Sequence, residues 1–275
     1  MKRRLPWGYS LLAPGYDVAA RVGSLGAIPQ AQGALLRLLP PIYNLLIVGG
    51  GSGLCLRFLP WERVTGRVTF VDIAPGMMQR ARHVAQALGV AERIQFLQQS
   101  VEHLDPRQRF DAVYTAFFLD QFPQPRCEAI MRLLHAALCP GGVWLDVDFS
   151  CNVEDGWARL YRAALLPFLY RFFRLVCGIE AVTLPNPQIF WQAQQYIARG
   201  KISYARASIE GCLLEKPYLT GIEENFAEKG GDDGLQLGSG AVLHSAPCQT
   251  LPHNLSKAHQ KVKPRNRCWI SLPLS

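Results

Sequence analysis

The sequence has no cysteine pair at the C-x-x-C spacing of small zinc sites and thioredoxin-like redox motifs. Its eight cysteines are scattered, at 55, 127, 139, 151, 177, 212, 248 and 268. The three histidines after residue 216 match no metal template either, so no metal site is predicted. Residues 1–17 are basic but have no continuous apolar stretch like that of a secretory signal. The expected compartment is therefore a reducing cytoplasm, with the cysteines as small buried apolar side chains rather than disulfides.

The sequence also has no basic run with interleaved aromatic residues, which is a common pattern in nucleic-acid-binding segments. The formal net charge is +8, but the arginines are spread through the chain. We therefore expect a generally basic surface and no nucleic-acid partner. Hydrophobic residues make up 49% of the 275 positions, which is enough for a folded body with a substantial core.

One long helix is predicted over residues 154–178, with a kink near Pro167. Arg162, Arg171 and Arg174 interrupt its apolar residues too often for it to cross a bilayer. Two interpretations stay open. The helix can cover the sheet, with its arginines extended into water. It can instead make transient contact with a membrane surface, or form a wall for a lipophilic substrate.

Short apolar runs that favour strands alternate with helical periods along the first two thirds of the chain. Strands are expected at 44–50, 67–72, 93–99, 110–118 and 143–149, and helices at 74–89 and 124–142. This alternation predicts a doubly wound α/β fold with a mostly parallel sheet and right-handed crossovers. Residues 200–208 and 211–216 are expected to add a terminal strand pair at one edge of the sheet.

The periodic pattern ends at Lys216. Residues 217–275 are rich in Gly, Pro, Ser and Asn and show no sustained period, so a dispensable tail with little packed structure is predicted. Residues 1–40 are expected to form a helical segment that covers the site. The catalytic domain is then expected to span residues 41–216.

Four glycines follow the first predicted strand, at positions 49, 50, 51 and 53. A dinucleotide-binding turn has the spacing G-x-G-x-x-G, which would need a glycine where Leu54 stands. The observed spacing is G-x-G-x-G. A side chain at Gly49 or Gly51 would collide with a nucleoside ligand bound against this turn. Gly50 widens the turn, and Gly53 lets it pack tightly where the next helix begins.

Asp72 ends the second predicted strand. A carboxylate at this point can accept hydrogen bonds from both hydroxyls of a ribose, and such charge-assisted bonds are the stronger kind. NAD enzymes have an acid at the same place. Asp72 alone therefore does not discriminate between a dinucleotide and another cofactor that contains a ribose.

Taken together, the G-x-G-x-G turn, Asp72 and the LCPGG stretch before the fifth strand resemble the class I S-adenosylmethionine-dependent methyltransferases. The resemblance covers residues 40–150 well and 10–216 loosely. It implies a seven-stranded Rossmann-like methyltransferase sheet with an antiparallel terminal strand, and S-adenosyl-L-methionine as cofactor. It also implies that the cofactor contacts the glycine turn and residues that follow the strands, namely Asp72, Ile73, Met77, Ser100, Val101 and Thr115.

The sequence departs from the family just before the glycine turn, where many members carry an acid for the methionine end of the cofactor. Ile47 and Val48 occupy those positions, so backbone carbonyls around Gly49 or another side chain must hold the methionine amino group. This departure keeps a non-catalytic methyltransferase-like subunit open as an alternative. Residues 11–17, LLAPGYD, resemble the N-terminal stretch of quinone-biosynthesis C-methyltransferases.

Two acids are candidates for the chemistry. Methyl transfer from a sulfonium needs mainly alignment and exclusion of water, and a base only where the acceptor must lose a proton. Asp120 and Asp148 stand near the carboxyl ends of the fourth and fifth strands, where open α/β sheets bind ligands. Asp120 is expected to contact the acceptor and Asp148 to act as base or anchor. A helix cap and a structural hydrogen-bond network are the alternatives.

Aromatic residues are candidates for an acceptor pocket: Tyr9, Tyr16, Phe117, Phe118 and Phe122. Core packing is the alternative role. The sequence therefore favours methyl transfer to a small, apolar or aromatic acceptor and leaves the oligomeric state open. An NAD(P)-dependent oxidoreductase is the other alternative, against which Leu54 and the lack of a Tyr-x-x-x-Lys pair both count.

Overall fold

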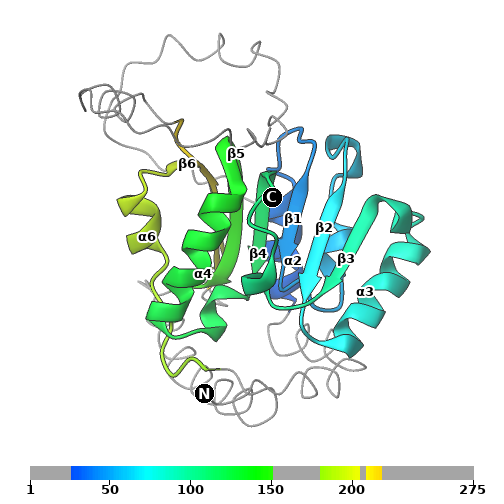
Figure 1. Ribbon diagram of the computed structural model, residues 1–275, viewed down its shortest axis with the longest axis horizontal. Coiled ribbons are helices and arrows are strands. Elements are labelled where there is room, and N and C mark those ends of the chain that lie inside the picture. The colour runs from blue at the N-terminus through cyan, green and yellow to red at the C-terminus, as the bar shows by residue number, and fades with distance from the viewer. Residues whose placement is uncertain (1–25, 151–179, 205–208, 219–275) are drawn as a thin grey trace, which may run out of the picture.

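The computed structural model describes residues 26–150, 180–204 and 209–218 (Figure 1). They form a seven-stranded sheet in the order β3-β2-β1-β4-β5-β7-β6. The strands are β1 (Leu45–Val48), β2 (Val68–Asp72), β3 (Ile94–Gln98), β4 (Phe110–Ala116), β5 (Leu138–Phe149), β6 (Ile197–Tyr204) and β7 (Ile209–Glu215). Strands β1 to β5 pair in parallel, and β7 runs antiparallel to both β5 and β6. The predicted doubly wound, mostly parallel sheet is confirmed, with the antiparallel strand lying between β5 and the edge strand β6.

Helices cover both faces of this sheet (Figure 1). On one face, α2 (Ala27–Leu36) and α3 (Pro75–Ala87) bury their apolar sides against alternate residues of the strands. On the other face, α4 (Gln124–Ala137) and α6 (Gln188–Ala193) do the same. The two cores follow from strand geometry, since successive side chains point to opposite faces.

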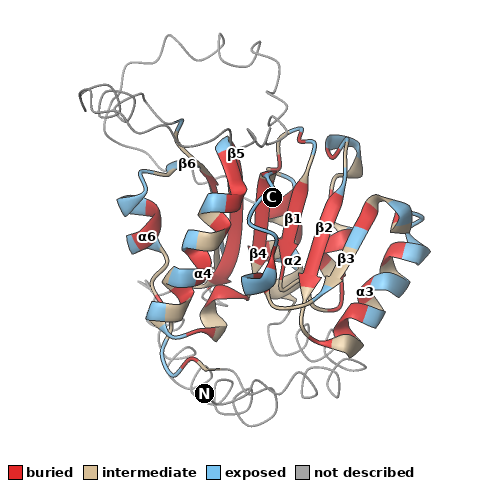
Figure 2. Cartoon of the chain, viewed as in Figure 1, coloured by how far each residue is buried: buried red, intermediate tan, exposed pale blue. Residues whose placement is uncertain are grey.

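The central strands are buried on both faces (Figure 2). All four residues of β1 are buried, which explains why its sequence is a continuous apolar run rather than an alternating one. β1 lies between β2 and β4. The glycine turn that follows β1 therefore emerges at the middle of the carboxyl edge of the sheet.

Helix α3 begins and ends close to its predicted limits. Pro75 stands at its first position, where its missing N–H costs nothing and its fixed φ suits the helix. Gly89, with φ 68°, follows the helix, and Val90 N donates to Ala85 O at 3.0 Å. This left-handed glycine is a common helix stop.

The predicted helix over 124–142 is wrong at its end. Helix α4 stops at Ala137, and Leu138 already has the extended angles φ −82° and ψ 128°. Pro140 cannot continue a helix, and Leu138 pairs with Phe110 of β4. Lys216 Nζ donates to the carbonyls of His135 and Leu138, at 2.7 and 2.8 Å. The LCPGG stretch therefore begins strand β5 instead of ending the helix.

The prediction that a regular helix begins after Gly53 is also wrong. Only one 3₁₀ turn, η1 (Leu54–Arg57), follows the glycine turn, and a second, η2 (Trp61–Arg63), comes after Pro60. Proline disfavours a helical residue directly before it, so the segment cannot extend into a regular α-helix.

Three cysteines agree with the expectation of free thiols and one does not. Cys55, Cys127 and Cys212 are free, and the first two are buried. Cys139 takes part in a disulfide, so the expectation that no cysteine is oxidised is wrong at this position.

Several expectations fall on residues that the structure does not describe. These are the pocket candidates Tyr9 and Tyr16, the helix at 154–178 and the tail beyond residue 218. Helix α2, which belongs to the predicted N-terminal segment 1–40, packs in the core against β5, β6 and β7. Within the described ranges, no helix has both the length and the apolar character needed to cross a membrane.

We propose that the folded domain ends near residue 218. Strand β7 pairs with β5 up to Glu215, and Lys216 exchanges backbone hydrogen bonds with Gly141 and Gly142 at 3.0 and 2.8 Å. A chain shortened after Tyr218 should therefore keep the circular dichroism and melting temperature of the full chain, with both measured under reducing conditions. A chain shortened after Leu213 removes the end of β7 and Lys216, and should lose cooperative unfolding. Loss of folding in the first chain would contradict the boundary.

Candidate functional site

The glycine turn depends on backbone conformations that only glycine adopts freely. Gly49, Gly51 and Gly53 have φ values of 64°, 56° and 80°, all in the left-handed region, where other residues are strained. Gly49 N donates to Val71 O at 2.9 Å, so the turn begins while the chain is still paired with β2.

Space around the turn shows what each glycine does. A Cβ at Gly49 would lie 2.3 Å from Phe118 Cδ2, and one at Gly50 would lie 2.2 Å from Phe70 Cζ. These two glycines therefore make room for rings of the protein itself, which corrects the expectation that Gly50 only widens the turn. A Cβ at Gly51 would meet no atom of the described residues within 4 Å, so among these residues the backbone of Gly51 is open to a ligand.

Gly53 has the predicted packing role. Its Cβ would lie 2.8 Å from Cα of Ala81, so the turn and helix α3 approach closely at this point. Even without an α-helix after it, the glycine is needed for tight packing.

Asp72 holds the glycine turn. Its Oδ2 accepts a hydrogen bond from Gly51 N at 2.9 Å, and its Oδ1 accepts one from Ala74 N at 2.8 Å. A carboxylate has about four lone-pair sites, so these bonds leave capacity for ribose hydroxyls. The structure thus brings together the two residues that the sequence singled out most clearly.

The turn after β3 lies beside Asp72 along the same edge, because Asp72 pairs with Gln98 in the sheet. Ser100 caps the short helix η4 (Val101–His103), with its Oγ accepting from Glu102 N at 3.4 Å. The other predicted cofactor contacts near this edge differ in exposure: Ile73 is half-buried, and Met77 and Val101 are buried.

Thr115 lies at the end of β4, but its side chain is bonded within the protein. Its Oγ1 donates to Asp146 Oδ1 at 2.6 Å and accepts from Trp144 Nε1 at 2.9 Å. The residue is fully buried. Only its backbone can therefore serve a cofactor.

Three carboxyl groups gather at the ends of β4 and β5. Asp146 and Asp148 come from β5, and Asp120 comes from η5 (Leu119–Gln121). Asp148 Oδ2 accepts from Asp120 N at 3.0 Å, Asp148 Oδ1 accepts from Phe149 N at 2.8 Å, and the side chains of Asp120 and Asp148 are hydrogen-bonded. These contacts support the structural interpretation, a hydrogen-bond network, and the catalytic roles of Asp120 and Asp148 stay predictions.

Burial changes the protonation of this cluster. It raises the pKa of Asp146 to about 7, and burial together with the charge of Asp146 raises the pKa of Asp120 to about 7. The pKa of Asp148 is raised well above its ordinary value by burial, then by the charges of Asp120 and Asp146. The three groups therefore do not all ionise at neutral pH, as is common for acid–base groups in active sites.

The predicted aromatic wall divides into two parts. Phe118 and Phe122 are buried, with ring centroids 5.1 Å apart, and belong to the core under α4. Phe117 is half-buried, and its ring lies 5.2 Å from that of Phe149. Phe117 also has φ 50°, an uncommon conformation for a bulky residue and one that clusters at functional sites.

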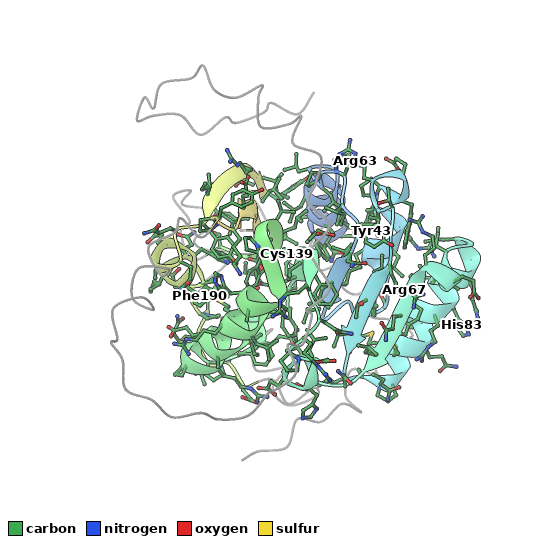
Figure 3. The ribbon with its side chains drawn as sticks, turned by 45° about the horizontal axis from the view of Figure 1, so that its top comes forward. Tyr43, Arg63, Arg67, His83, Cys139 and Phe190 are labelled. Atoms are coloured by element: carbon green, nitrogen blue, oxygen red, sulfur yellow. The ribbon has the colours of Figure 1, made fainter. Side chains whose placement is uncertain are left out.

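Basic residues gather elsewhere. Arg63 and Arg67 precede β2 and lie toward the amino ends of the strands, near Tyr43 (Figure 3). Arg63 Nη1 donates to the carbonyls of Arg37 and Leu39, each at 2.9 Å. These residues lie at the edge of the sheet opposite to the glycine turn.

Sequence reasoning missed Arg126, Glu102 and Glu180, which form ion pairs beside the turn after β3. They come from three separate segments of the chain, η4, α4 and the stretch that begins at residue 180, and belong to no short motif. The sequence offers one signal for this cluster, the charge of Arg126 in the first turn of a predicted amphipathic helix. That signal does not identify the acids with which Arg126 pairs.

A sheet of this strand order, with a glycine turn after its first strand and an acid at the end of its second, defines the Rossmann-like methyltransferase fold. Residues 45–142 match the family described as "Methyltransferase domain". The matched residues are thus similar to a methyltransferase domain, and the sheet around them has the fold of the class I methyltransferases.

The similar curated proteins are quinone-biosynthesis enzymes. A ubiquinone/menaquinone biosynthesis C-methyltransferase of Bartonella tribocorum is 32% identical over 152 residues, which cover 53% of this chain and 57% of the relative. That of Pseudomonas putida strain GB-1 is 34% identical over 124 residues, covering 45% and 48%. The chain spans about half the length of the curated relatives it matches.

Solved structures agree on the fold. DhpI in complex with SAH superposes with a TM-score of 0.54 at 18% identity, covering 77% of this chain and 95% of DhpI. An O-methyltransferase family 2 protein of Planctomyces limnophilus, in complex with apigenin, also gives 0.54 at 18% identity, covering 73% and 61%. At these identities the likeness shows the fold alone.

The glycine contacts predict unequal effects of two alanine substitutions. Gly49→Ala combines left-handed strain with overlap on Phe118 and should cost about 2–5 kcal/mol of unfolding free energy. Gly51→Ala meets no atom and should cost about 1–2 kcal/mol. Denaturant unfolding of both variants measures the difference. Equal losses would contradict the assigned contacts.

Burial of Asp146 leads us to expect that the difference in unfolding free energy between the wild type and Asp146→Asn depends on pH. Its folded pKa is raised above the unfolded value, so its contribution is present below the ordinary pKa of aspartate and is lost as pH rises through about 7. Asp146→Asn keeps an oxygen for Thr115 and cannot ionise. Between about pH 5 and about pH 8, its unfolding free energy should rise relative to the wild type. A difference that stays constant with pH would contradict the burial of an ionisable carboxyl here.

Proposed function

We propose that this protein transfers a methyl group from S-adenosyl-L-methionine to a small acceptor with apolar or aromatic surface. The observation that carries the proposal is the 2.9 Å hydrogen bond from Gly51 N to Asp72 Oδ2. It fixes an open glycine backbone and an acid side by side at the carboxyl edge of the central strands. Ligands of open α/β sheets bind at this edge.

The residues around this edge fit the cofactor. Asp72 would accept from the ribose hydroxyls, and the backbone at Gly51 would lie against the nucleoside because no side chain stands there. Ile73, which is half-buried, would offer apolar surface next to Asp72, whereas the other predicted contact, Met77, is buried. The turn at Ser100 and Val101 would frame the adenine edge.

The methionine end has no acidic partner directly before the turn. Ile47 and Val48 are buried on the two faces of the sheet, so their side chains cannot reach a ligand. We therefore assign the amino group of the methionine to backbone carbonyls around Gly49. The apolar residues Ile47 and Val48 at these positions are the one observation that favours the second candidate function, a non-catalytic methyltransferase-like subunit.

The Asp120–Asp148 pair would handle the acceptor's proton. When bound, the cofactor supplies an activated methyl group on a sulfonium. An acceptor hydroxyl or ring carbon that gains the methyl group loses a proton, and a carboxyl with pKa near 7 can take it at neutral pH. Asp120 would contact the acceptor, and Asp148 would share the proton through their hydrogen bond.

The curated relatives support an aromatic acceptor, since they act in ubiquinone and menaquinone biosynthesis. Phe117, half-buried beside Phe149, supports the proposal of an aromatic wall near the carboxyl ends of β4 and β5. Tyr9 and Tyr16, which the sequence also predicts for this pocket, lie outside the described residues. A lipophilic acceptor of this kind also supports transient contact of residues 154–178 with a membrane surface.

Calorimetric titration tests the proposal. The protein should bind S-adenosylmethionine and S-adenosylhomocysteine but not NADH. Asp72→Ala should weaken binding by about 1.5–3 kcal/mol, the scale of hydrogen bonds to a charged group. Asp105→Ala, which removes an exposed acid elsewhere, is the matched control and should bind as the wild type does.

Other outcomes have distinct meanings. Binding of NADH alone would overturn the methyltransferase proposal. A folded protein that binds none of the three ligands would favour the non-catalytic subunit. Unchanged affinity in Asp72→Ala would refute the ribose assignment.

A further inference from the structure

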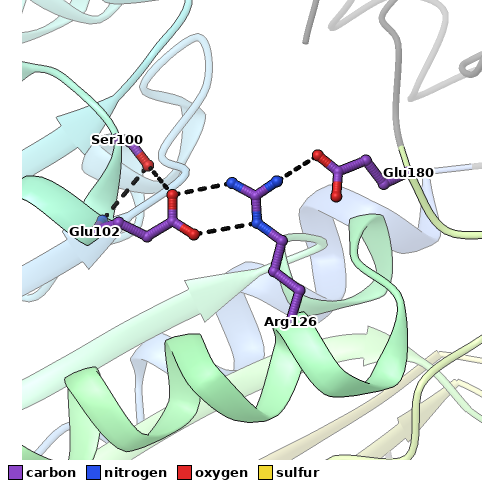
Figure 4. Close-up of polar contacts among 4 residues, drawn as sticks. All are labelled: Ser100, Glu102, Arg126 and Glu180. Atoms are coloured by element: carbon purple, nitrogen blue, oxygen red, sulfur yellow. Dashed lines mark hydrogen bonds and ion pairs between the residues drawn. The ribbon is translucent and has the colours of Figure 1, made fainter. Parts of the chain in front are cut away.

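Arg126 lies between two acids from distant parts of the chain (Figure 4). It stands in the first turn of α4, and its guanidinium makes a two-pronged contact with Glu102. Nε donates to Oε1 at 3.1 Å and Nη2 donates to Oε2 at 2.9 Å. Its remaining nitrogen, Nη1, donates to Glu180 Oε1. All three guanidinium nitrogens are therefore used.

The Glu102 side of this cluster fixes the turn after β3. Ser100 Oγ donates to Glu102 Oε2 at 3.0 Å and accepts from Glu102 N at 3.4 Å. Val101, between them, is buried in the core under α4. The Glu102 carboxylate is thus held from two sides, by Arg126 and by Ser100, and the backbone of the turn has little freedom.

The Glu180 side ties the same arginine to the neighbourhood of Asp120. The backbone N–H groups of Glu180 and Ala181 donate to Gln121 O at 3.2 and 3.1 Å. Asn186 N donates to Gln124 Oε1 at 2.7 Å. Residues 180–186 therefore lie along η5 and the start of α4, next to the residue proposed to contact the acceptor.

The position of the guanidinium is well determined. It lies over the ring of Phe122, 5.4 Å from the centroid, and its side chain is 32% exposed, against 66% for Arg132 in the surface pair with Glu128. Partial burial opposes the charge, but the hydrogen bonds to Glu102 and Glu180 outweigh it and raise the pKa of Arg126. The two-pronged contact with Glu102 is more directional than a single ion pair, and the contact with Glu180 is partly buried, so water screens it less than an exposed pair.

From these contacts we infer that Arg126 is a positioning residue for the adenine end of the cofactor. Through Glu102 it holds the Ser100–Val101 turn in place, and through Glu180 it ties that turn to the chain around Gln121. This inference rests on the proposed function, because it takes the turn after β3 as the adenine edge. Arg126 itself need not touch the cofactor.

Two ligands and three variants test the inference in the full-length protein. Arg126→Gln should weaken binding of S-adenosylhomocysteine and of adenosine by the same factor, about tenfold, which lies within the range for coupled residues of one network. Arg126→Lys keeps one charge but not the fork, so its affinity should lie between those of Arg126→Gln and the wild type. Arg132→Gln breaks an exposed pair on the same helix and should change neither affinity.

Thermal unfolding separates positioning from folding. The titrations are made at a temperature where every variant is folded. If Arg126→Gln does not fold, Glu102→Gln replaces it, because this variant removes the negative charge that Arg126 binds. Glu102→Gln should also lose affinity for both ligands.

The outcomes are distinguishable. Wild-type protein that binds neither ligand removes the proposed function and this inference with it. Wild-type binding together with unchanged affinity in Arg126→Gln, or in Glu102→Gln where it serves as the replacement, would overturn the inference alone. Two further results would overturn the inference. One is a loss of affinity for S-adenosylhomocysteine without a loss of affinity for adenosine. The other is an affinity in Arg126→Lys that is no higher than that in Arg126→Gln.

Discussion

The contact between the Asp72 carboxylate and the Gly51 N–H is the interaction on which the site depends. It joins the ends of β1 and β2, two neighbouring strands in the parallel part of the sheet. Three glycines in left-handed conformations give the turn its shape, but they also make it intrinsically loose, since glycine loses most conformational freedom on folding. The carboxylate offsets that looseness by fixing both Gly51 and the start of helix α3 through Ala74.

The carboxyl cluster at the ends of β4 and β5 costs stability, whereas the contact of Asp72 with Gly51 contributes to it. Asp146 and Asp148 lie on one side of a strand whose other neighbours are apolar, and burying them is costly without partners. Thr115, Trp144 and backbone N–H groups supply those partners. The remaining cost appears as raised pKa values, so the cluster is only partly ionised at neutral pH.

Much of this could be predicted from the sequence because it is encoded locally. Apolar runs gave the strands, and Pro75 and Gly89 limited α3. What was missed depends on contacts between distant segments. The end of α4 is set by pairing of Leu138 with Phe110, and the helix after Gly53 shrinks to a 3₁₀ turn. Gly49 and Gly50 are required by rings at Phe118 and Phe70, which no spacing rule connects to the turn.

The site shows the same division. Gly51 and Asp72 were predicted because they belong to a motif whose spacing reflects the shape of the ligand. The links among Glu102, Arg126 and Glu180 could not be predicted, because each residue lies in a different segment of the chain and the three become neighbours only after folding.

The most direct test of the account is a crystal structure with S-adenosylhomocysteine bound. It should show both ribose hydroxyls within hydrogen-bonding distance of the Asp72 carboxylate and the nucleoside against Gly51. A nucleoside bound away from this edge, or an Asp72 that makes no contact with the ribose, would contradict it.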